Sequence, residues 1–132
     1  MRTRKVSFLS HDVPLSRVPV HGAWAVGEKG AVARLFPVYA RNRRDVMIGD
    51  VWVSPELRGR GTGRRLLVAA LRTARRRGFS RAILWTTRDN TTATTLYKSL
   101  GFHRRPMPKR IQREIASLSW VKSPVFYSKK IQ

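Results

Sequence analysis

Apolar, β-prone residues gather in short runs through the first half of the chain. Residues 23–27 and 31–40 are two such runs, and the turn Glu28-Lys29-Gly30 between them predicts a β-hairpin. Residues 46–53 form a third run, which predicts a strand. Its Gly49 indicates a bulge or a close approach of the backbone to a ligand.

Two stretches around these strands lack that pattern. Residues 1–22, interrupted by Pro14 and Pro19, are predicted to be irregular apart from a short strand at residues 5–9. Residues 41–45 are predicted to be a charged connection between two strands.

The second half alternates helices with strands. From Thr62 to Arg77 the apolar residues recur at helical spacing, and Gly78 ends this helix. The same reasoning predicts a strand at residues 81–86, a helix at 91–100 capped by Gly101, a helix at 109–119 and a strand at 124–131. Because the chain has 132 residues and no repeat or linker, we expect one α/β domain, residues 1–132.

A loop rich in glycine and arginine lies between the strand at residues 46–53 and the helix that begins at Thr62. Its glycines lack a Cβ atom, so consecutive N–H groups can point into one small space. The helix adds unpaired N–H groups and the positive end of its dipole. The loop therefore predicts a phosphate or pyrophosphate site, formed by Arg58, Gly59, Arg60, Gly61, Gly63 and Arg64.

Two common phosphate-binding motifs do not fit this loop. A nucleoside-triphosphate loop would continue as Gly-Lys-Ser or Gly-Lys-Thr, whereas Gly63 is followed by Arg64 and Arg65. A dinucleotide fingerprint would need a third glycine where Arg64 or Leu66 stands, depending on the frame. What remains is Arg58-x-x-Gly61-x-Gly63 between a strand and a helix.

This arrangement resembles the acyl-coenzyme A pyrophosphate loop of the GNAT superfamily of N-acetyltransferases. Residues 81–103 add a strand, then Asn90-x-x-Ala93, Leu96-Tyr97 and Gly101-Phe102, which is similar to the family's second motif. The resemblance covers residues 23–130 and implies a mixed, mostly antiparallel sheet with splayed central strands flanked by helices. Members usually carry one or two helices between their first two strands. The N-terminal region is short by comparison, so we expect an acceptor side that is open or completed by a second copy, a partner chain or the substrate itself.

The resemblance also implies acetyl-coenzyme A as cofactor and an amine as acceptor. Backbone N–H groups before the loop would bind the pantetheine arm and the acetyl carbonyl, the loop would hold the pyrophosphate, and Asn90 would contact the pantetheine. The residues to which a cofactor-binding role carries over are Val51, Trp52, Val53, Arg58, Gly59, Arg60, Gly61, Thr62, Gly63, Arg64, Asn90, Ala93 and Tyr97.

By the same resemblance, Tyr97 stands at the family's general-acid position. A phenol with a pKa of about 10 is suited to return a proton to a thiolate. The alternative is an aromatic residue packed on the core. For the general base the family's usual place falls on Met47, which cannot serve. Asp45 lies on the same strand face as Met47 if alternation holds, and Asp50 lies nearer the loop on the other face. An ordered water, or an amine that arrives neutral, would do the same work.

The charge is extreme, with 28 Lys and Arg against 7 Asp and Glu and a formal net charge of +21. Such a field attracts polyanions, so RNA or another nucleic acid is a predicted partner, and an arginine-rich composition is the alternative. The chain has no cysteine, and His11, His21 and His103 are scattered, so we expect no disulfide, thiol nucleophile or metal site. No run reaches the length of a membrane span, and we expect a cytoplasmic protein.

Three functions remain open. The favoured one is an acetyltransferase for an amine carried by a protein or a nucleic acid. The second is an acetyltransferase for a small metabolite amine. The third is a basic protein that kept the fold, lost turnover and binds RNA or a ribonucleoprotein.

Overall fold

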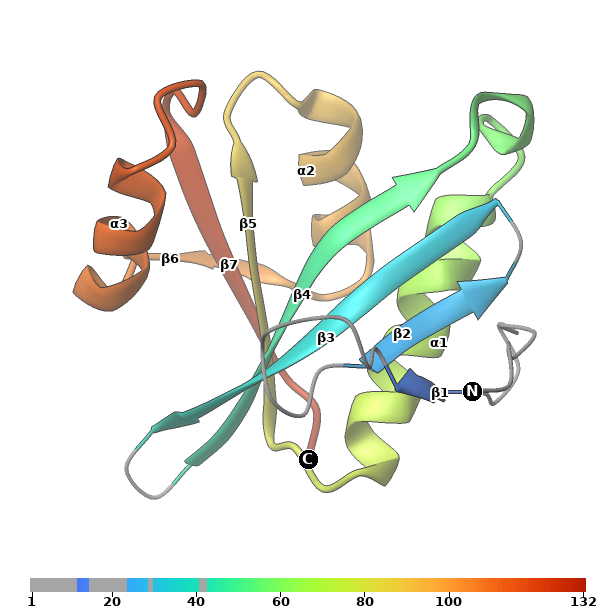
Figure 1. Cartoon of the computed structure of the whole chain (residues 1–132), viewed down its shortest axis with the longest axis horizontal. Helices are drawn as coiled ribbons and strands as arrows, with labels where there is room; N and C mark the ends of the chain where they lie inside the picture. Colours follow the sequence, from blue (N-terminus) through green and yellow to red (C-terminus); the bar gives the residue numbers. More distant parts are fainter. Residues whose placement is uncertain (1–11, 15–23, 29, 41–42) are drawn as a thin grey trace. The chain divides into compact units, whose positions relative to one another are not determined.

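A computed structural model describes residues 12–14, 24–28, 30–40 and 43–132 of the chain (Figure 1). The chain divides into two compact units, residues 1–82 with 130–132 and residues 83–129. The predicted strand at residues 5–9 and Pro19 lie outside the described residues. The single domain over residues 1–132 stays a prediction.

The first unit is an antiparallel sheet covered by one long helix. Its strands pair in the order β1-β2-β3-β4, and the 3-10 helix η1 follows β4. The hairpin predicted for residues 23–40 is confirmed, because Glu28 pairs with Ala31 across the turn. The elements are β1 (Asp12–Pro14), β2 (Trp24–Glu28), β3 (Ala31–Ala40), β4 (Arg43–Val53), η1 (Pro55–Leu57) and α1 (Thr62–Arg76).

Two predictions for this unit were wrong. Residues 43–45 are not a connection but the start of β4, where Arg43 and Arg44 pair with Ala40 and Tyr39. Residues 12–14 are not irregular, because Asp12 pairs with Val26 and Pro14 with Trp24 at the edge of the sheet. Strand pairing with a distant segment overrides the local preference of charged residues and proline for loops, and an edge position tolerates proline.

The bulge predicted near Gly49 is confirmed. Arg34 pairs with Gly49 and Val32 with Trp52, so two residues of β4 stand opposite one residue of β3. Asp50 is one of these two residues. Since an extra residue bends and twists its strand, the bulge changes the direction of the last three residues of β4 just before the glycine-rich loop.

Helix α1 packs on one face of this sheet (Figure 1). Its buried side chains recur at the predicted spacing, and they are covered by the apolar residues of β2, β3 and β4. The helix ends at Arg76, with Arg77 as its C-cap, and Gly78 follows with a φ of +87°. The core residues of the unit include Val26, Ala33, Leu35, Val46, Ile48, Leu66, Leu67, Ala70, Ala74 and Phe79.

The second unit joins a smaller sheet to two helices. Its strands lie in the order β5-β7-β6, with β6 antiparallel to β7. The short strand β6 was not predicted, and helix α3 ends three residues before the predicted position. The elements are β5 (Arg81–Thr87), α2 (Thr91–Ser99), β6 (His103–Arg105), α3 (Lys109–Ala116) and β7 (Pro124–Lys130).

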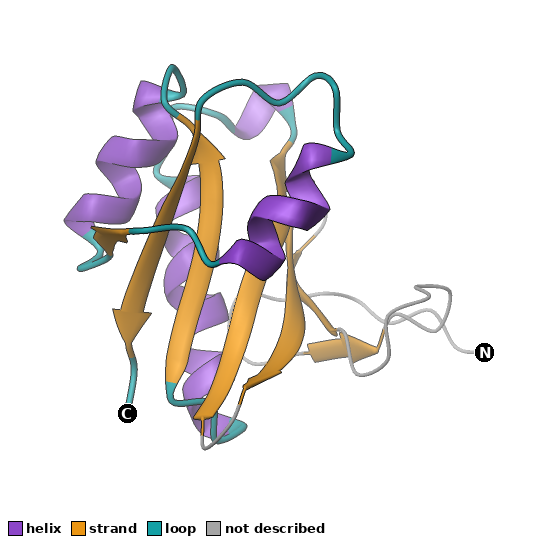
Figure 2. Ribbon diagram, turned by 90° about the vertical axis from the view of Figure 1, so that its left-hand side faces the viewer, coloured by secondary structure: helices purple, strands orange, loops and turns teal. Residues whose placement is uncertain are grey.

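The two helices of this unit cover opposite faces of its sheet, as Figure 2 shows. Alternation along β7 explains the arrangement, since neighbouring residues of a strand point to opposite faces. Tyr127 contacts Tyr97 of α2, while Pro124 lines a groove with Ile115 of α3. No helix among the described residues is long and apolar enough to cross a membrane.

Candidate active site

The glycine-rich loop is braced against the end of β4. The main-chain N–H of Ser54 donates to the carbonyl of Gly30 at 2.6 Å, and Arg58 Nε donates to the carbonyl of Val53 at 2.9 Å. Thr62 Oγ1 donates to the carbonyl of Leu57 at 2.9 Å. Two side chains predicted to touch a cofactor, Arg58 and Thr62, therefore also set the shape of the loop.

Two of the three loop glycines have left-handed backbone conformations. Gly59 has a φ of +76° and Gly61 a φ of +75°, which L-residues rarely adopt. A Cβ atom on Gly59 would meet nothing within 4 Å, so the space beside this residue is open. Gly63 differs from the prediction, because it lies in the first turn of α1 and is not one of the left-handed glycines.

The beginning of α1 concentrates positive charge. Gly61 is the N-cap and has no side chain with which to cap the helix, and the first turn contains no acidic residue. Arg64 and Arg65 stand in that turn, where the helix dipole disfavours cations. An anion bound at this end would accept hydrogen bonds from the first N–H groups and relieve the repulsion.

Arg65 is a residue of this loop that the sequence reasoning missed. Its Nη1 donates to the carbonyl of Arg60 at 3.0 Å, and its Nη2 donates to Thr62 Oγ1 at 3.2 Å. The side chain thus ties the loop to the first turn of the helix. The signal in the sequence is a second arginine directly after Arg64.

The strand residues before the loop expose apolar surface. Trp52 is 49% exposed and Val51 is 37% exposed, while their neighbour Val53 is half-buried. Trp52 pairs with Val32 and Val53 with Ala31. Exposing large apolar side chains to water costs free energy, so a ligand that covered this end of β4 would remove that cost.

The two candidate bases differ in position along β4. The register is regular from Arg43 to Gly49, so Asp45 and Met47 share a face as predicted. Asp45 is buried, with 6% of its surface exposed. Asp50 lies in the bulge. The assignment of either residue as general base stays a prediction.

In the second unit Asn90 caps helix α2. Its Oδ1 accepts from the N–H of Ala93 at 3.2 Å, and its Nδ2 donates to Thr86 Oγ1 at 3.3 Å. The spacing Asn90-x-x-Ala93 therefore has a structural reason, because an N-cap side chain bonds the N–H three residues later. An amide nitrogen carries two hydrogens, and only one is used by Thr86.

Tyr97 is buried in an aromatic cluster of the second unit. Its ring centroid lies 6.0 Å from that of Phe102 and 6.0 Å from that of Tyr127. Burial raises the pKa of the Tyr97 phenol above its ordinary value of 10.0. The phenol is therefore protonated at neutral pH, as a general acid must be. Phe102 is buried, and His103 is exposed.

The raised pKa of Tyr97 predicts a loss of stability in alkali. The unfolded phenol ionises first, so its contribution to stability is complete below about pH 10 and is lost as the pH rises through the folded pKa. We expect the free energy of unfolding of the wild type to fall relative to that of Tyr97→Phe across this range. Denaturant titrations of both proteins at several pH values measure the difference, and parallel curves would contradict the prediction.

Comparison with known proteins agrees with these features. The chain matches the model of the Acetyltransferase (GNAT) family over residues 9–102. It is 46% identical over 63 residues to a mycothiol acetyltransferase of Thermobispora bispora, a match that covers 46% of this chain and 21% of that protein. The chain spans about a fifth of the length of the curated relatives that it matches.

Solved structures share the fold at low sequence identity. The structure of yncA from Salmonella typhimurium, solved with its cofactor acetyl-CoA, has a TM-score of 0.63 at 23% identity, covering 83% of this chain and 64% of that chain. The ribosomal-protein-S18-alanine N-acetyltransferase of Escherichia coli has a TM-score of 0.61 at 18% identity, covering 88% and 72%. With its mixed, mostly antiparallel architecture and the family match over most of its length, the chain belongs to the GNAT family of acetyltransferases.

Proposed function

We propose that this chain binds acetyl-coenzyme A and transfers the acetyl group to a primary amine on a macromolecule. The observation that carries the proposal is the left-handed pair Gly59 and Gly61 at the start of α1, surrounded by arginines. Such a loop suits the pyrophosphate of coenzyme A, because the open side next to Gly59 leaves room for phosphate oxygens close to the backbone. Acetyl-coenzyme A is the acyl donor of the family.

Three segments of the chain would hold the cofactor. Arg58 to Arg64 would bind the pyrophosphate with main-chain N–H groups and guanidinium charge. The backbone of residues 51–53 would bind the pantetheine arm and the acetyl carbonyl. The second Nδ2 hydrogen of Asn90 would serve a pantetheine carbonyl, and its orientation is already fixed by Thr86 and Ala93.

The reaction would be a direct attack in a ternary complex. When bound, acetyl-coenzyme A supplies an activated thioester, so orientation of the acceptor can provide much of the rate acceleration. The residues of this chain would donate hydrogen bonds to the carbonyl oxygen through the backbone near Val53 and would protonate the departing sulfur through Tyr97. The bond formed is N–C and the bond broken is C–S, and the proton lost by the amine goes to Asp50, Asp45 or water.

We infer the class of amine from the placement of the candidate general bases. An α-amino group has an ordinary pKa of about 7.7–8.0, so a useful fraction is neutral at physiological pH, whereas a lysine amine at about 10.4 needs a strong base. Asp45 is buried, which limits the access of an acceptor amine to this carboxylate and favours an acceptor that needs no strong base. We therefore favour an α-amino group of a peptide or an aminoacyl ester.

The exposed face of α1 supports a polyanionic partner such as RNA. Arg64, Arg72, Arg75 and Arg76 are exposed along this helix, and α1 contains no acidic residue. A helix rises about 1.5 Å per residue, so these charges form a stripe that a phosphate backbone can follow.

Replacing Arg72, Arg75 and Arg76 by Gln should weaken RNA binding without changing the affinity for coenzyme A. Each arginine that binds a phosphate releases counterions, so the slope of log affinity against log salt should become shallower by about 1 for each such arginine replaced. Filter binding of tRNA across a salt series measures this slope. An unchanged slope would mean that these arginines do not bind RNA and that the charge of α1 reflects only an arginine-rich composition.

Acetyl transfer itself is tested by incubating the chain with radiolabelled acetyl-coenzyme A and three acceptor pools, namely lysate protein, tRNA and small amines. Label in protein or tRNA supports the proposal. Label in small amines alone would favour the second candidate, for which the likeness to the mycothiol acetyltransferase is the supporting observation. Coenzyme A binding with no transfer to any pool would favour a binding protein without turnover.

A further inference from the structure

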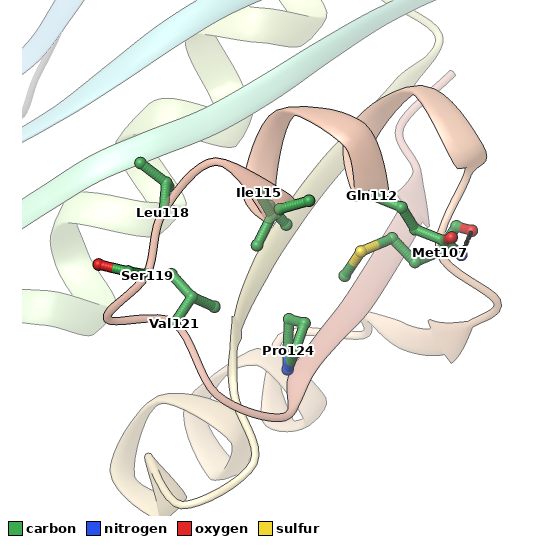
Figure 3. A pocket seen from close by; sticks show the side chains of 8 residues that line it. Met107, Gln112, Ile115, Leu118, Ser119, Val121 and Pro124 are labelled. Atoms are coloured by element: carbon green, nitrogen blue, oxygen red, sulfur yellow. Dashed lines mark hydrogen bonds between the residues drawn. The ribbon is translucent and has the colours of Figure 1, made fainter.

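Helix α3 and the segment that follows it form an apolar groove with β7. Met107, Ile115, Leu118, Val121 and Pro124 line it, and its volume is about 420 Å³. Figure 3 shows Met107, Ile115 and Pro124 directed toward one hollow from three parts of the second unit. A space of this size accommodates one or two large apolar side chains.

A second hollow adjoins the groove and has two basic residues in its lining. It has a volume of about 430 Å³ and shares Met107 and Pro124 with the first, while Arg104 and Arg105 line its other end. Both arginines are exposed. An apolar hollow and a hollow bordered by two basic residues therefore lie next to each other, with Met107 and Pro124 in the wall of both.

The residues next to the groove lining in the sequence are also a mixture of apolar and basic residues. Trp120, which stands between the lining residues Ser119 and Val121 in the sequence, is 69% exposed, and its ring centroid lies 6.5 Å from that of Trp85. Lys109 and Arg113 are exposed on α3. Glu114 is the one acidic residue of the sequence after Asp89, and its Oε1 lies 4.0 Å from Arg110 Nε.

We propose that these two adjoining hollows dock an acidic peptide segment of a partner protein. A large apolar side chain of the peptide would enter the hollow lined by Ile115 and Val121, and a carboxylate would lie at the hollow bordered by Arg104 and Arg105. Charge complementarity selects an acidic occupant, and the exposed Trp120 and the arginines are residue types that dominate protein interfaces. This proposal does not rest on the proposed acetyl transfer.

The lining favours a peptide over a nucleobase. Recognition of a nucleobase requires polar groups that face its edges, and the apolar hollow offers mainly Gln112 and Ser119. Gln112 Nε2 already donates to the carbonyl of Met107 at 2.9 Å. An aliphatic side chain needs no such partner and gains by leaving water.

The proposal is tested by fluorescence anisotropy with the full chain and two labelled peptides of equal charge. One peptide alternates Asp and Glu with Leu and Phe, and in the other Ser replaces Leu and Phe. At near-physiological salt the apolar peptide should bind at least about tenfold more tightly, because burying one large apolar side chain is worth that factor or more. Equal affinities would overturn the proposal, since charge alone would then explain the binding.

Two variants locate the binding, each with a matched control. Arg104→Glu with Arg105→Glu should weaken the apolar peptide about tenfold or more, whereas Arg72→Glu with Arg75→Glu makes the same change in net charge on α1 and should have a much smaller effect. Ala116→Phe should fill the groove and weaken binding, whereas Thr95→Phe on α2 should not. Ala116 and Thr95 are both exposed and lie outside the core, so circular dichroism should show an intact fold for both variants.

The outcomes that overturn the proposal are distinct from a failure of acetyl transfer. Equal effects of the two charge variants would show that the peptide responds to net charge only. An unchanged affinity in Ala116→Phe would place the peptide elsewhere. A single-stranded poly(U) probe that binds more tightly than the apolar peptide, and loses affinity in Arg104→Glu with Arg105→Glu, would make the surface a nucleic-acid site.

Discussion

Gly61→Val should abolish measurable binding of coenzyme A while the protein remains folded. Gly61 has a φ of +75°, a conformation that costs an L-residue about 1–2 kcal/mol and a β-branched residue more. A valine would either strain the loop or turn its N–H groups out of the position in which they can meet a phosphate. The nearest atom to the new Cβ would be Arg65 Nη1 at 3.6 Å, a flexible side chain, so the core is not disturbed. Isothermal titration calorimetry with coenzyme A measures the loss.

Gly78→Val is the matched control for this change. Gly78 has a φ of +87° at the other end of α1, and its new Cβ would also meet only the end of an arginine side chain, Arg44 Nη1 at 3.1 Å. The backbone penalty is similar, but the site is remote from the loop, so coenzyme A affinity should persist. If Gly61→Val binds coenzyme A as the wild type does, the loop is not the pyrophosphate site. If both variants lose binding alike, general destabilisation explains the result.

Tyr97→Phe should lower turnover on the order of 10²-fold with little change in coenzyme A affinity. The substitution keeps the ring that packs on Phe102 and Tyr127 and removes only the hydroxyl that would protonate the thiolate. An interaction made only in the transition state affects turnover and not ground-state binding. Single-turnover measurements with the acceptor that gives the fastest transfer isolate the chemical step from product release.

Tyr127→Phe makes the same chemical change on the neighbouring ring. Tyr127 is 2% exposed and lies 6.0 Å from Tyr97, so both variants remove a hydroxyl from one buried aromatic cluster. A purely structural role for Tyr97 predicts that the two variants behave alike. General-acid catalysis predicts a large loss in Tyr97→Phe and near-wild-type turnover in Tyr127→Phe. Equal turnover of all three proteins would leave Tyr97 with a packing role only.

Motifs that depend on local backbone geometry could be predicted from the sequence. Gly61 and Gly101 mark a helix start and a helix end because they adopt positive φ, and both stand where the pattern placed them. Thr62 to Arg76 forms a helix because its apolar residues recur at helical spacing. Two such motifs in the right order were sufficient to predict the family and the fold class.

The roles of individual side chains could not be predicted in the same way, because they depend on interactions with distant residues. Asn90 carries a cofactor-binding prediction, yet its side chain also caps α2 and donates to Thr86. Arg58 was predicted to supply charge, and its Nε also holds the loop to Val53. In both cases the second role depends on where a carbonyl, a hydroxyl or an N–H group lies after folding.

By itself the sequence determined the glycine-rich loop before α1, the helices and the two longer strands after Thr62 and the excess of positive charge, because glycine conformation, apolar periodicity and charge are properties of the residues themselves. Only the tertiary structure decided the register of β3 on β4, the burial of Asp45 and the position of Asp50 in a bulge. It alone placed Tyr97 beside Tyr127, where burial raises the pKa of the Tyr97 phenol. Register and burial are sums over many interactions between residues far apart in the chain, and a local pattern does not contain them.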